Sequence, residues 1–213
     1  SGFIFLKEMS MRKIITVSRE FGSGGRELGK RLSDILGIEY VDGEIASELA
    51  KLTNLDGDYI GKQLENGICG FQPVYARSFS RVSQSSGTAM LLASQHKVIK
   101  EIAAKKDCII VGRGADAVLA GLNPFKIFVY ADMPSKIMRC RSRCADGENP
   151  SDRELERKIK EIDKARKTTH GVYSTRVWGD KEGYDLCINT TEVVIGEIAP
   201  LVAEYARTFF KNN

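Results

Sequence analysis

Long apolar runs, histidine and a strong charge of one sign are all scarce in this sequence of 213 residues. No apolar run approaches the roughly 18 residues that a membrane-spanning helix needs, so we expect no membrane partner. A formal net charge of +4 is too small to indicate binding to nucleic acid. The two histidines, His96 and His170, form no Ser-His-Asp pattern, which argues against hydrolase chemistry and favours structural roles for both.

Cysteine is also sparse, and the five cysteines are an odd number that cannot all pair with one another. Cys108 and Cys187 lie in apolar runs, where a thiol packs as a small hydrophobic group. Cys140 and Cys144 are four residues apart, but no second Cys or His pair stands nearby, so we predict no protein metal site. This usage favours a reducing compartment, and we expect a cytoplasmic location.

Apolar periodicity predicts strands that alternate with helices along the chain. The strands are expected at 13–18, 38–43, 107–112, 126–131 and 184–190. Helices are expected at 26–36, 44–52, 88–106, 134–143 and 153–167, with a closing helix at 192–210 that Pro200 interrupts. Parallel strands need crossover connections of this length, so the pattern predicts an α/β fold with one parallel five-stranded sheet and helices on both faces.

The length is compatible with one large domain, which we place at residues 12–213. Residues 1–11 are expected to be an N-terminal extension, because their short apolar patch lacks a basic leader and a cleavage site. Periodicity fades between about 54 and 87, where we expect a partly helical insertion. The long apolar closing helix is compatible with a homodimer face or with core packing.

A glycine-rich turn, FGSGG at 21–25, joins the first expected strand to the first expected helix. Such a turn presents free backbone N–H groups and the positive end of the helix dipole, both of which suit a phosphate. The residues predicted to bind nucleotide phosphate are Gly22, Ser23, Gly24, Gly25, Arg26 and Glu27. The alternative is a tight strand-to-helix turn without a ligand, in which Glu27 only complements the helix dipole.

No lysine stands in register with this turn. If Gly22 and Gly24 are the loop glycines, the usual lysine position holds Gly25, and Arg26 is the nearest cation. An arginine there can grip phosphate oxygens with two parallel hydrogen bonds. The string from Gly24 to Lys30 spells G-x-x-x-x-G-K, but helical periodicity places Lys30 inside the helix, so we interpret this match as accidental.

A second candidate site follows the third expected strand. The segment VGRGAD at 111–116 places Arg113 and Asp116 just beyond the carboxyl end of that strand, where open α/β sheets bind their ligands. In the simpler alternative, these two residues pair only with each other. Arginines also gather between residues 139 and 166, which suits a polyanionic ligand.

Together these segments resemble the cytidylate kinase-like family over about residues 12–205. The matching text is ITVSREFGSGGRELGKRL, YVDGEI, CIIVGRGAD, KIFVYAD, DKARK and WGDKEGYDLCINT. The resemblance implies a P-loop kinase-like fold with an acceptor-binding insertion at about 54–87 and a lid at about 145–175. It also implies transfer of the γ-phosphoryl group of ATP, with Mg²⁺, to CMP, dCMP or a similar nucleotide.

The resemblance assigns roles to individual residues. The residues implied to bind the acceptor are Asp42, Arg113, Asp116 and Asp163. The predicted catalytic cations are Arg26, Arg113 and Arg166; of these, the resemblance implies Arg113 and Arg166. The clustering of arginines, and not the resemblance, predicts that four more would close over the phosphates as part of the lid: Arg139, Arg143, Arg153 and Arg157. Because the family's phosphate-loop lysine and threonine are missing here, two alternatives stay open: a nucleotide-binding regulatory protein without turnover, and a kinase of a non-nucleotide small molecule.

Overall fold

The computed structural model describes residues 12–42, 86–144 and 147–212. For residues 86–91 it describes the backbone only. The expected N-terminal extension, the expected helix at 44–52 and most of the insertion at 54–87 lie outside the described residues. Among the described helices, none combines the length and the apolar character that crossing a bilayer requires.

The sheet contains five strands. They are β1 (Ile14–Arg19), β2 (Glu39–Val41), β3 (Cys108–Val111), β4 (Phe125–Tyr130) and β5 (Leu186–Asn189). Their spatial order is β2-β3-β1-β4-β5, and every neighbouring pair is parallel. The predicted five-stranded parallel sheet is therefore confirmed. Because β1 lies at the centre, the loop that follows it opens at the middle of the sheet's carboxyl edge.

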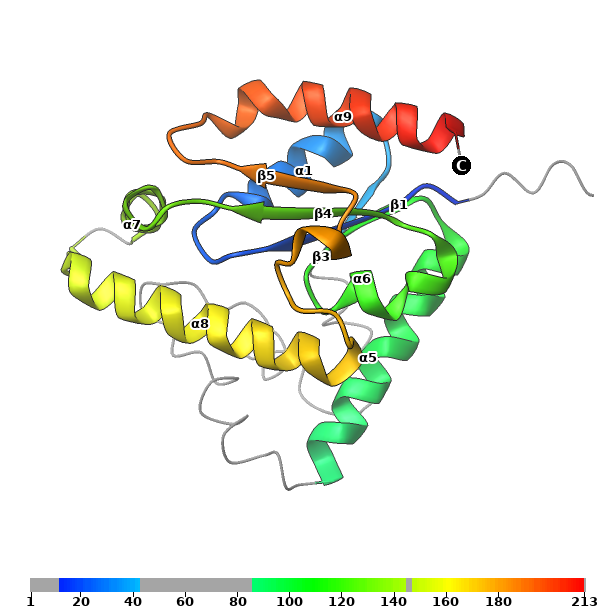
Figure 1. The fold of residues 1–213 in the computed structure, drawn as a ribbon, viewed down its shortest axis with the longest axis horizontal. Coiled ribbons are helices and arrows are strands. Elements are labelled where there is room, and N and C mark those ends of the chain that lie inside the picture. Colours follow the sequence, from blue (N-terminus) through cyan, green and yellow to red (C-terminus); the bar gives the residue numbers. More distant parts are fainter. Residues whose placement is uncertain (1–11, 43–85, 145–146, 213) are drawn as a thin grey trace, which may run out of the picture.

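Helices cover both faces of this sheet (Figure 1). On one face lie α1 (Gly25–Leu36) and α9 (Ile195–Asn212); on the other lie α5 (Ser86–Lys105), the short α6 (Ala115–Val118) and, farther out, α8 (Asp152–Tyr173). The remaining elements are α7 (Met133–Arg141) and two 3-10 turns, η1 (Ala120–Leu122) and η2 (Lys181–Gly183).

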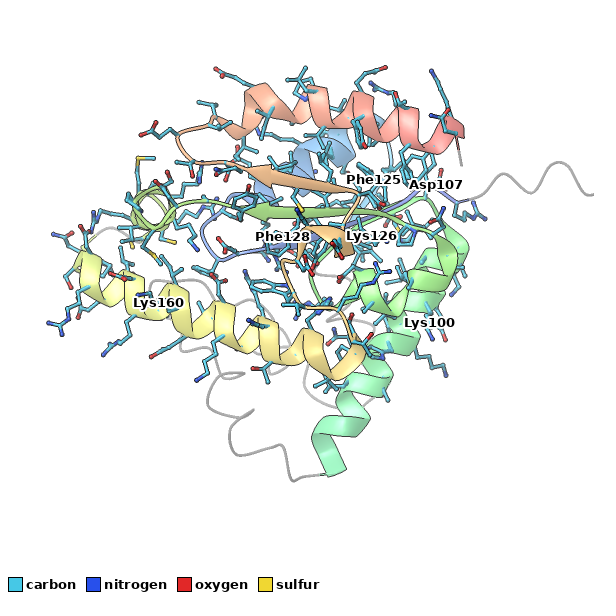
Figure 2. All side chains as sticks on the ribbon, viewed as in Figure 1. Lys100, Asp107, Phe125, Lys126, Phe128 and Lys160 are labelled. Carbon is cyan, nitrogen blue, oxygen red and sulfur yellow. The ribbon has the colours of Figure 1, made fainter. Side chains whose placement is uncertain are left out.

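The period of two along each strand divides the core between these helices. Ile15 and Val17 of β1 pack with α1 and α9, whereas Ile14 packs with α5 and α6. Side chains fill the space between the sheet and the helices on either side (Figure 2). Phe125 on β4, which is fully buried, contacts the rings of Phe209 and two other aromatic residues of α9. These contacts pack α9 against β4 and so help to hold the sheet whose carboxyl edge carries the candidate site.

Helix ends follow the signals in the sequence. Asp132 caps α7 as predicted, because its carboxylate accepts a hydrogen bond from the Ser135 amide at 2.9 Å. Gly37 ends α1 in the left-handed conformation with φ of 66°. The interruption expected at Pro200 is wrong, since α9 runs through it. Pro200 is the sixth residue of that helix, where the missing N–H removes a single intrahelical hydrogen bond.

Candidate functional site

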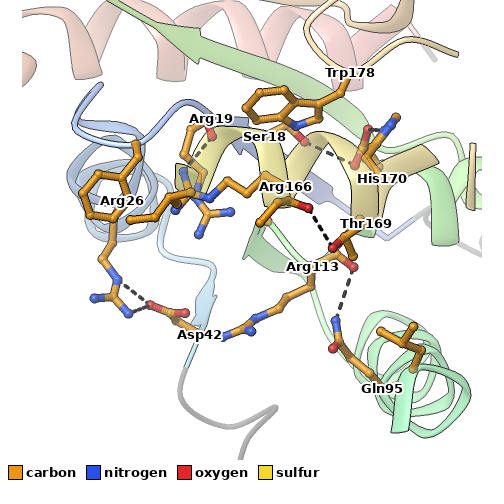
Figure 3. Close-up of a pocket in the computed structure, with 17 residues that line it drawn as sticks. Ser18, Arg19, Arg26, Asp42, Gln95, Arg113, Arg166, Thr169, His170 and Trp178 are labelled. Carbon is orange, nitrogen blue, oxygen red and sulfur yellow. Dashed lines mark hydrogen bonds and ion pairs between the residues drawn. The ribbon is translucent and has the colours of Figure 1, made fainter. Parts of the chain in front are cut away.

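A pocket opens at the carboxyl edge of the sheet, next to the glycine-rich loop (Figure 3). Its walls come from the ends of β1, β2 and β3, from α5 and α8, and from Trp178. Segments far apart in the sequence meet here because parallel strands all end at the same edge. Four arginines line this pocket, and we call them the arginine cluster: Arg19, Arg26, Arg113 and Arg166.

Arg26 projects from the first turn of α1 and pairs with Asp42 at the end of β2, with 2.6 Å between Nη2 and Oδ2. The Tyr40 hydroxyl donates to the same carboxylate oxygen at 3.2 Å. Burial, with the negative charge of Asp42 beside it, raises the pKa of Tyr40 to about 12. Figure 3 shows the Arg113 side chain extending toward Asp42 from the opposite wall. Asp42 thus lies between two of the predicted cations.

Arg166 of α8 reaches back to the end of β1. Its Nη1 donates to the Arg19 carbonyl oxygen at 2.9 Å, and its guanidinium lies 5.3 Å from the centre of the Phe21 ring. Burial, together with the nearby charges of Arg113 and Arg26, lowers the pKa of Arg166 to about 10, although Asp163 acts in the opposite direction. An arginine stays protonated at neutral pH, so this shift expresses the cost of burying the charge first and the crowding of positive charge second.

Arg19, the last residue of β1, is a member of the cluster that we did not predict from the sequence. Burial and the charges of Arg166 and Arg113 lower the pKa of Arg19 well below its ordinary value. A sequence signal existed in Gly112, which follows β3: a Cβ there would lie 1.7 Å from Nη1 of Arg19. Only a residue without a Cβ at position 112 therefore leaves room for the guanidinium of Arg19.

A buried polar chain forms the floor of the pocket. Ser18 Oγ donates to Oδ1 of Asp116 at 3.2 Å, and His170 Nε2 lies 2.8 Å from Oδ2 of the same carboxylate. Ser18, Asp116 and His170 are each at most 7% exposed. Both acceptor oxygens of Asp116 are thus engaged by the protein. Arg113 and Asp116 therefore do not pair only with each other, which removes the simpler alternative for that segment.

The glycine-rich loop runs from Glu20 to Gly24, with positive φ at Gly22 and Gly24. Its first half is anchored from outside the pocket: the Phe21 amide donates to Asp163 at 2.7 Å, and Glu20 pairs with the buried Lys136 at 2.8 Å. Asp163 therefore supports the loop instead of lining the pocket. Burial raises the pKa of Asp163, although Arg166 and Lys136 act against this.

The second half of the loop leaves several amides available. Within the described part of the chain, the amides of Gly22, Gly24, Gly25 and Arg26 have no hydrogen-bond acceptor. Ser23, Gly24 and Gly25 are nevertheless buried. A buried amide without a partner costs free energy, and a bound anion removes this cost. The loop is thus suited to a phosphate group.

The other predicted site residues lie outside the pocket. Glu27 pairs with Arg31 at 2.9 Å on the surface of α1, and Lys30 lies inside α1 as expected, paired with Asp34. Arg139 donates to the backbone carbonyls of Thr190 and Val193, which ties α7 to the loop before α9. The remaining three predicted lid arginines are exposed on the surface: Arg143, Arg153 and Arg157. Their role in a lid stays a prediction.

The fold and the site together define a class. A central parallel strand, a glycine-rich loop that opens the first helix, and an arginine-lined pocket beside it are the features of P-loop kinases that act on small molecules. The chain belongs to the cytidylate kinase-like family, whose model matches residues 14–192. The resemblance inferred from the sequence is confirmed.

Solved structures agree on the fold. An uncharacterized protein from Eubacterium ventriosum is 25% identical, with a TM-score of 0.66 over 92% of this chain and 99% of that one. Shikimate kinase from Acinetobacter baumannii is 13% identical, with a TM-score of 0.52 over 93% and 95% of the two chains. A gluconokinase from Sinorhizobium meliloti is 12% identical, with a TM-score of 0.51 and 95% of each chain covered. A search of curated proteins gave no significant match.

Proposed function

We propose that this protein transfers the γ-phosphoryl group of ATP to a nucleoside monophosphate, with CMP or dCMP as the acceptor. The observation that carries the proposal is the arginine cluster beside the glycine-rich loop: four guanidinium groups line one pocket. Phosphoryl transfer requires positive charge around the phosphoryl oxygens and alignment of two substrates, more than covalent participation by the protein. A pocket of this charge at this edge of the sheet supplies both.

The donor phosphates fit the loop. The unpartnered amides of Gly22, Gly24, Gly25 and Arg26 provide donors at the positive end of the α1 dipole. The described residues contain no cluster of three or more metal-ligating side chains. Mg²⁺ commonly binds through substrate phosphates, waters and one or two carboxylates, so it would enter with ATP and lower the charge repulsion between its phosphates. Neither residue after the lysine position supplies the usual Ser or Thr hydroxyl: Arg26 is paired with Asp42 and Glu27 with Arg31.

The acceptor would occupy the pocket between α5 and α8. Arg113 and Arg166 face it, as do Asp42 and the floor residue Asp116. In the reaction, an oxygen of the acceptor phosphate forms a bond to the γ-phosphorus while the bond to the β-γ bridging oxygen breaks. ADP and a nucleoside diphosphate are the products. The chain's part is to hold the two phosphates in line and to offset their charge.

A second candidate function follows from one observation. The position of the usual lysine is occupied by Gly25, and the two residues that follow, Arg26 and Glu27, carry no hydroxyl. This substitution favours a nucleotide-binding protein that retains the fold without turnover. ATP binding without ADP formation would support that function.

The test is ADP release by the purified protein with ATP, Mg²⁺ and a panel of acceptors that includes CMP, dCMP, the other common monophosphates, shikimate and gluconate. We expect turnover with a pyrimidine monophosphate and a loss of at least about 100-fold in kcat/KM for Arg113→Ala. Arg207→Ala is the matched control, because Arg207 pairs with Glu204 on the surface of α9. Turnover with shikimate or gluconate alone would show that the acceptor is not a nucleotide. The absence of turnover with every acceptor would refute the proposal.

A further inference from the structure

The side chain of Arg19 lies where the phosphate loop lacks its lysine. In the register set by Gly22 and Gly24, the lysine position is Gly25, the first residue of α1. A Cβ at Gly25 would lie 2.6 Å from Cβ and 2.9 Å from Cγ of Arg19. Arg19 therefore occupies the space that the base of a lysine side chain would need.

From there the side chain of Arg19 crosses the edge of the sheet to the end of β3. Its Nη1 and Cζ lie 1.7 Å and 2.6 Å from the place that a Cβ on Gly112 would take. Gly112 has φ of 78°, so its backbone conformation also favours glycine. Two glycines on different elements thus shape one path for this arginine, and the path ends in the pocket (Figure 3).

The guanidinium at the end of this path has Asp42 as a nearby counter-charge, but that carboxylate is paired with Arg26, and its effect on the pKa of Arg19 is smaller than those of burial, Arg166 and Arg113. The guanidinium makes no hydrogen bond or ion pair with any residue that the structure describes, although Arg26, Arg113 and Arg166 all lie close enough to act on its charge. Its pKa is lowered by burial first and by these arginines next. A partly buried guanidinium with unused donors, surrounded by like charges, is stabilised by an anion with several oxygens.

We propose that Arg19 supplies the cation that the phosphate loop lacks and binds the β- and γ-phosphates of the nucleotide donor. The inference rests on the proposed function for the identity of the donor. It differs from the expectation for Arg26, whose guanidinium is paired with Asp42 and whose side chain is 56% exposed. The apparent loss of the lysine is then a relocation of positive charge from the start of α1 to the end of β1.

Calorimetry with the full chain tests the binding role. Arg19→Ala should weaken ATP binding by about 10- to 100-fold and leave AMP binding unchanged, because AMP lacks the two phosphates concerned. The variant should fold, since it removes one of four crowded cations and keeps the Arg19 carbonyl that Arg166 uses. Lys30→Ala is the matched control: it removes the lysine of the apparent G-x-x-x-x-G-K string, which lies on the surface of α1, and should change neither affinity.

A rescue experiment separates charge from packing. In Arg19→Gly the space over Gly25 opens, and the double variant Arg19→Gly/Gly25→Lys places a lysine at the usual position. Gly25 does not need a positive φ, so α1 accepts the side chain. We expect the double variant to recover at least about 10-fold of the ATP affinity lost in Arg19→Gly. A purely structural Arg19 would not be rescued by a lysine at residue 25.

The outcomes distinguish this inference from the proposed function. Wild-type protein that binds ATP without turnover refutes the phosphotransferase, while the effect of Arg19→Ala on ATP binding still decides the role of Arg19. Equal ATP affinity in wild type and Arg19→Ala overturns the inference even if wild type turns over. A change confined to the KM of the acceptor also overturns it, because Arg19 would then bind the acceptor's phosphate. Wild type that does not bind ATP overturns both.

Discussion

Replacement of Asp116 with alanine should destabilise the protein by removing the shared partner of two buried groups. The Asp116 carboxylate lies 2.8 Å from His170 Nε2 and accepts from Ser18 Oγ at 3.2 Å. Asp116 is 7% exposed and His170 is 5% exposed, so water cannot readily replace the lost contacts. His170 Nδ1 already has no hydrogen-bond partner in the described structure. Without Asp116, neither ring nitrogen would have one.

The magnitude follows from what remains buried. Each unsatisfied buried polar group costs about 1–3 kcal/mol, and Asp116→Ala leaves two such groups, Ser18 Oγ and His170 Nε2. We therefore expect Asp116→Ala to lower the free energy of unfolding by about 2–5 kcal/mol. Asp116→Asn keeps an oxygen acceptor and the side-chain volume, so its loss should be about 1–2 kcal/mol.

The assay is urea unfolding monitored by circular dichroism, with a double-mutant cycle over Asp116→Ala and His170→Ala. Once His170 is gone, removal of Asp116 leaves fewer groups without partners. The interaction energy from the cycle should accordingly be at least about 1 kcal/mol. Additive losses, or a change below about 0.5 kcal/mol for Asp116→Ala, would refute the argument. They would show that Asp116 and His170 do not stabilise each other, or that water replaces the lost contact.

Three further predictions concern positions away from the pocket floor. Burial raises the pKa of the Cys140 thiol to about 11, so the folded state keeps a proton that the unfolded state releases near pH 9. The free energy of unfolding should therefore fall as the pH rises from about 9 to about 11. Cys140→Ala should remove most of this pH dependence when unfolding is measured across that range. Arg139→Ala, which frees the backbone carbonyls of Thr190 and Val193, should cost about 1–3 kcal/mol in urea unfolding, and an unchanged midpoint would contradict the anchoring role. An added Cβ meets no other atom at Gly37 or at Gly171, so backbone conformation should decide the effect of alanine at each. Gly37→Ala should destabilise the protein by about 1 kcal/mol because φ is 66°, whereas Gly171→Ala inside α8 should stabilise it by about 0.5–1 kcal/mol. Equal shifts in Tm for the two variants would contradict this reasoning.

Local signals were enough to predict the elements that hold the site. Each strand of the sheet is a short apolar run, and the turn at 21–25 is marked by its glycines, so the order of elements could be derived without tertiary contacts. The expected break at Gly112 coincides with the end of β3 at Val111. Two points were missed: the helix continues through Pro200, which lies near its start where a proline is tolerated, and no helix was expected at the short α6.

Spacing could not identify which charges share the pocket. Asp163 and Arg166 are three residues apart on α8, yet Arg166 lines the pocket while Asp163 holds the Phe21 amide behind it. Arg139 is a residue type that commonly binds phosphate, but its guanidinium donates to the backbone carbonyls of Thr190 and Val193 in the loop before α9. These assignments depend on the rotation of α7 and α8 against the sheet, which no short stretch of sequence encodes.

The order of strands and helices, the parallel sheet and the place of the glycine turn were all readable from the chain, because hydrophobic periodicity and backbone preference act over a few residues. Only folding could reveal that Arg19 runs over Gly25 to Gly112, or that His170 meets Asp116 from 54 residues away. Such pairs depend on distances set by the packing of whole elements. Their electrostatic and steric consequences therefore exist only in the assembled structure.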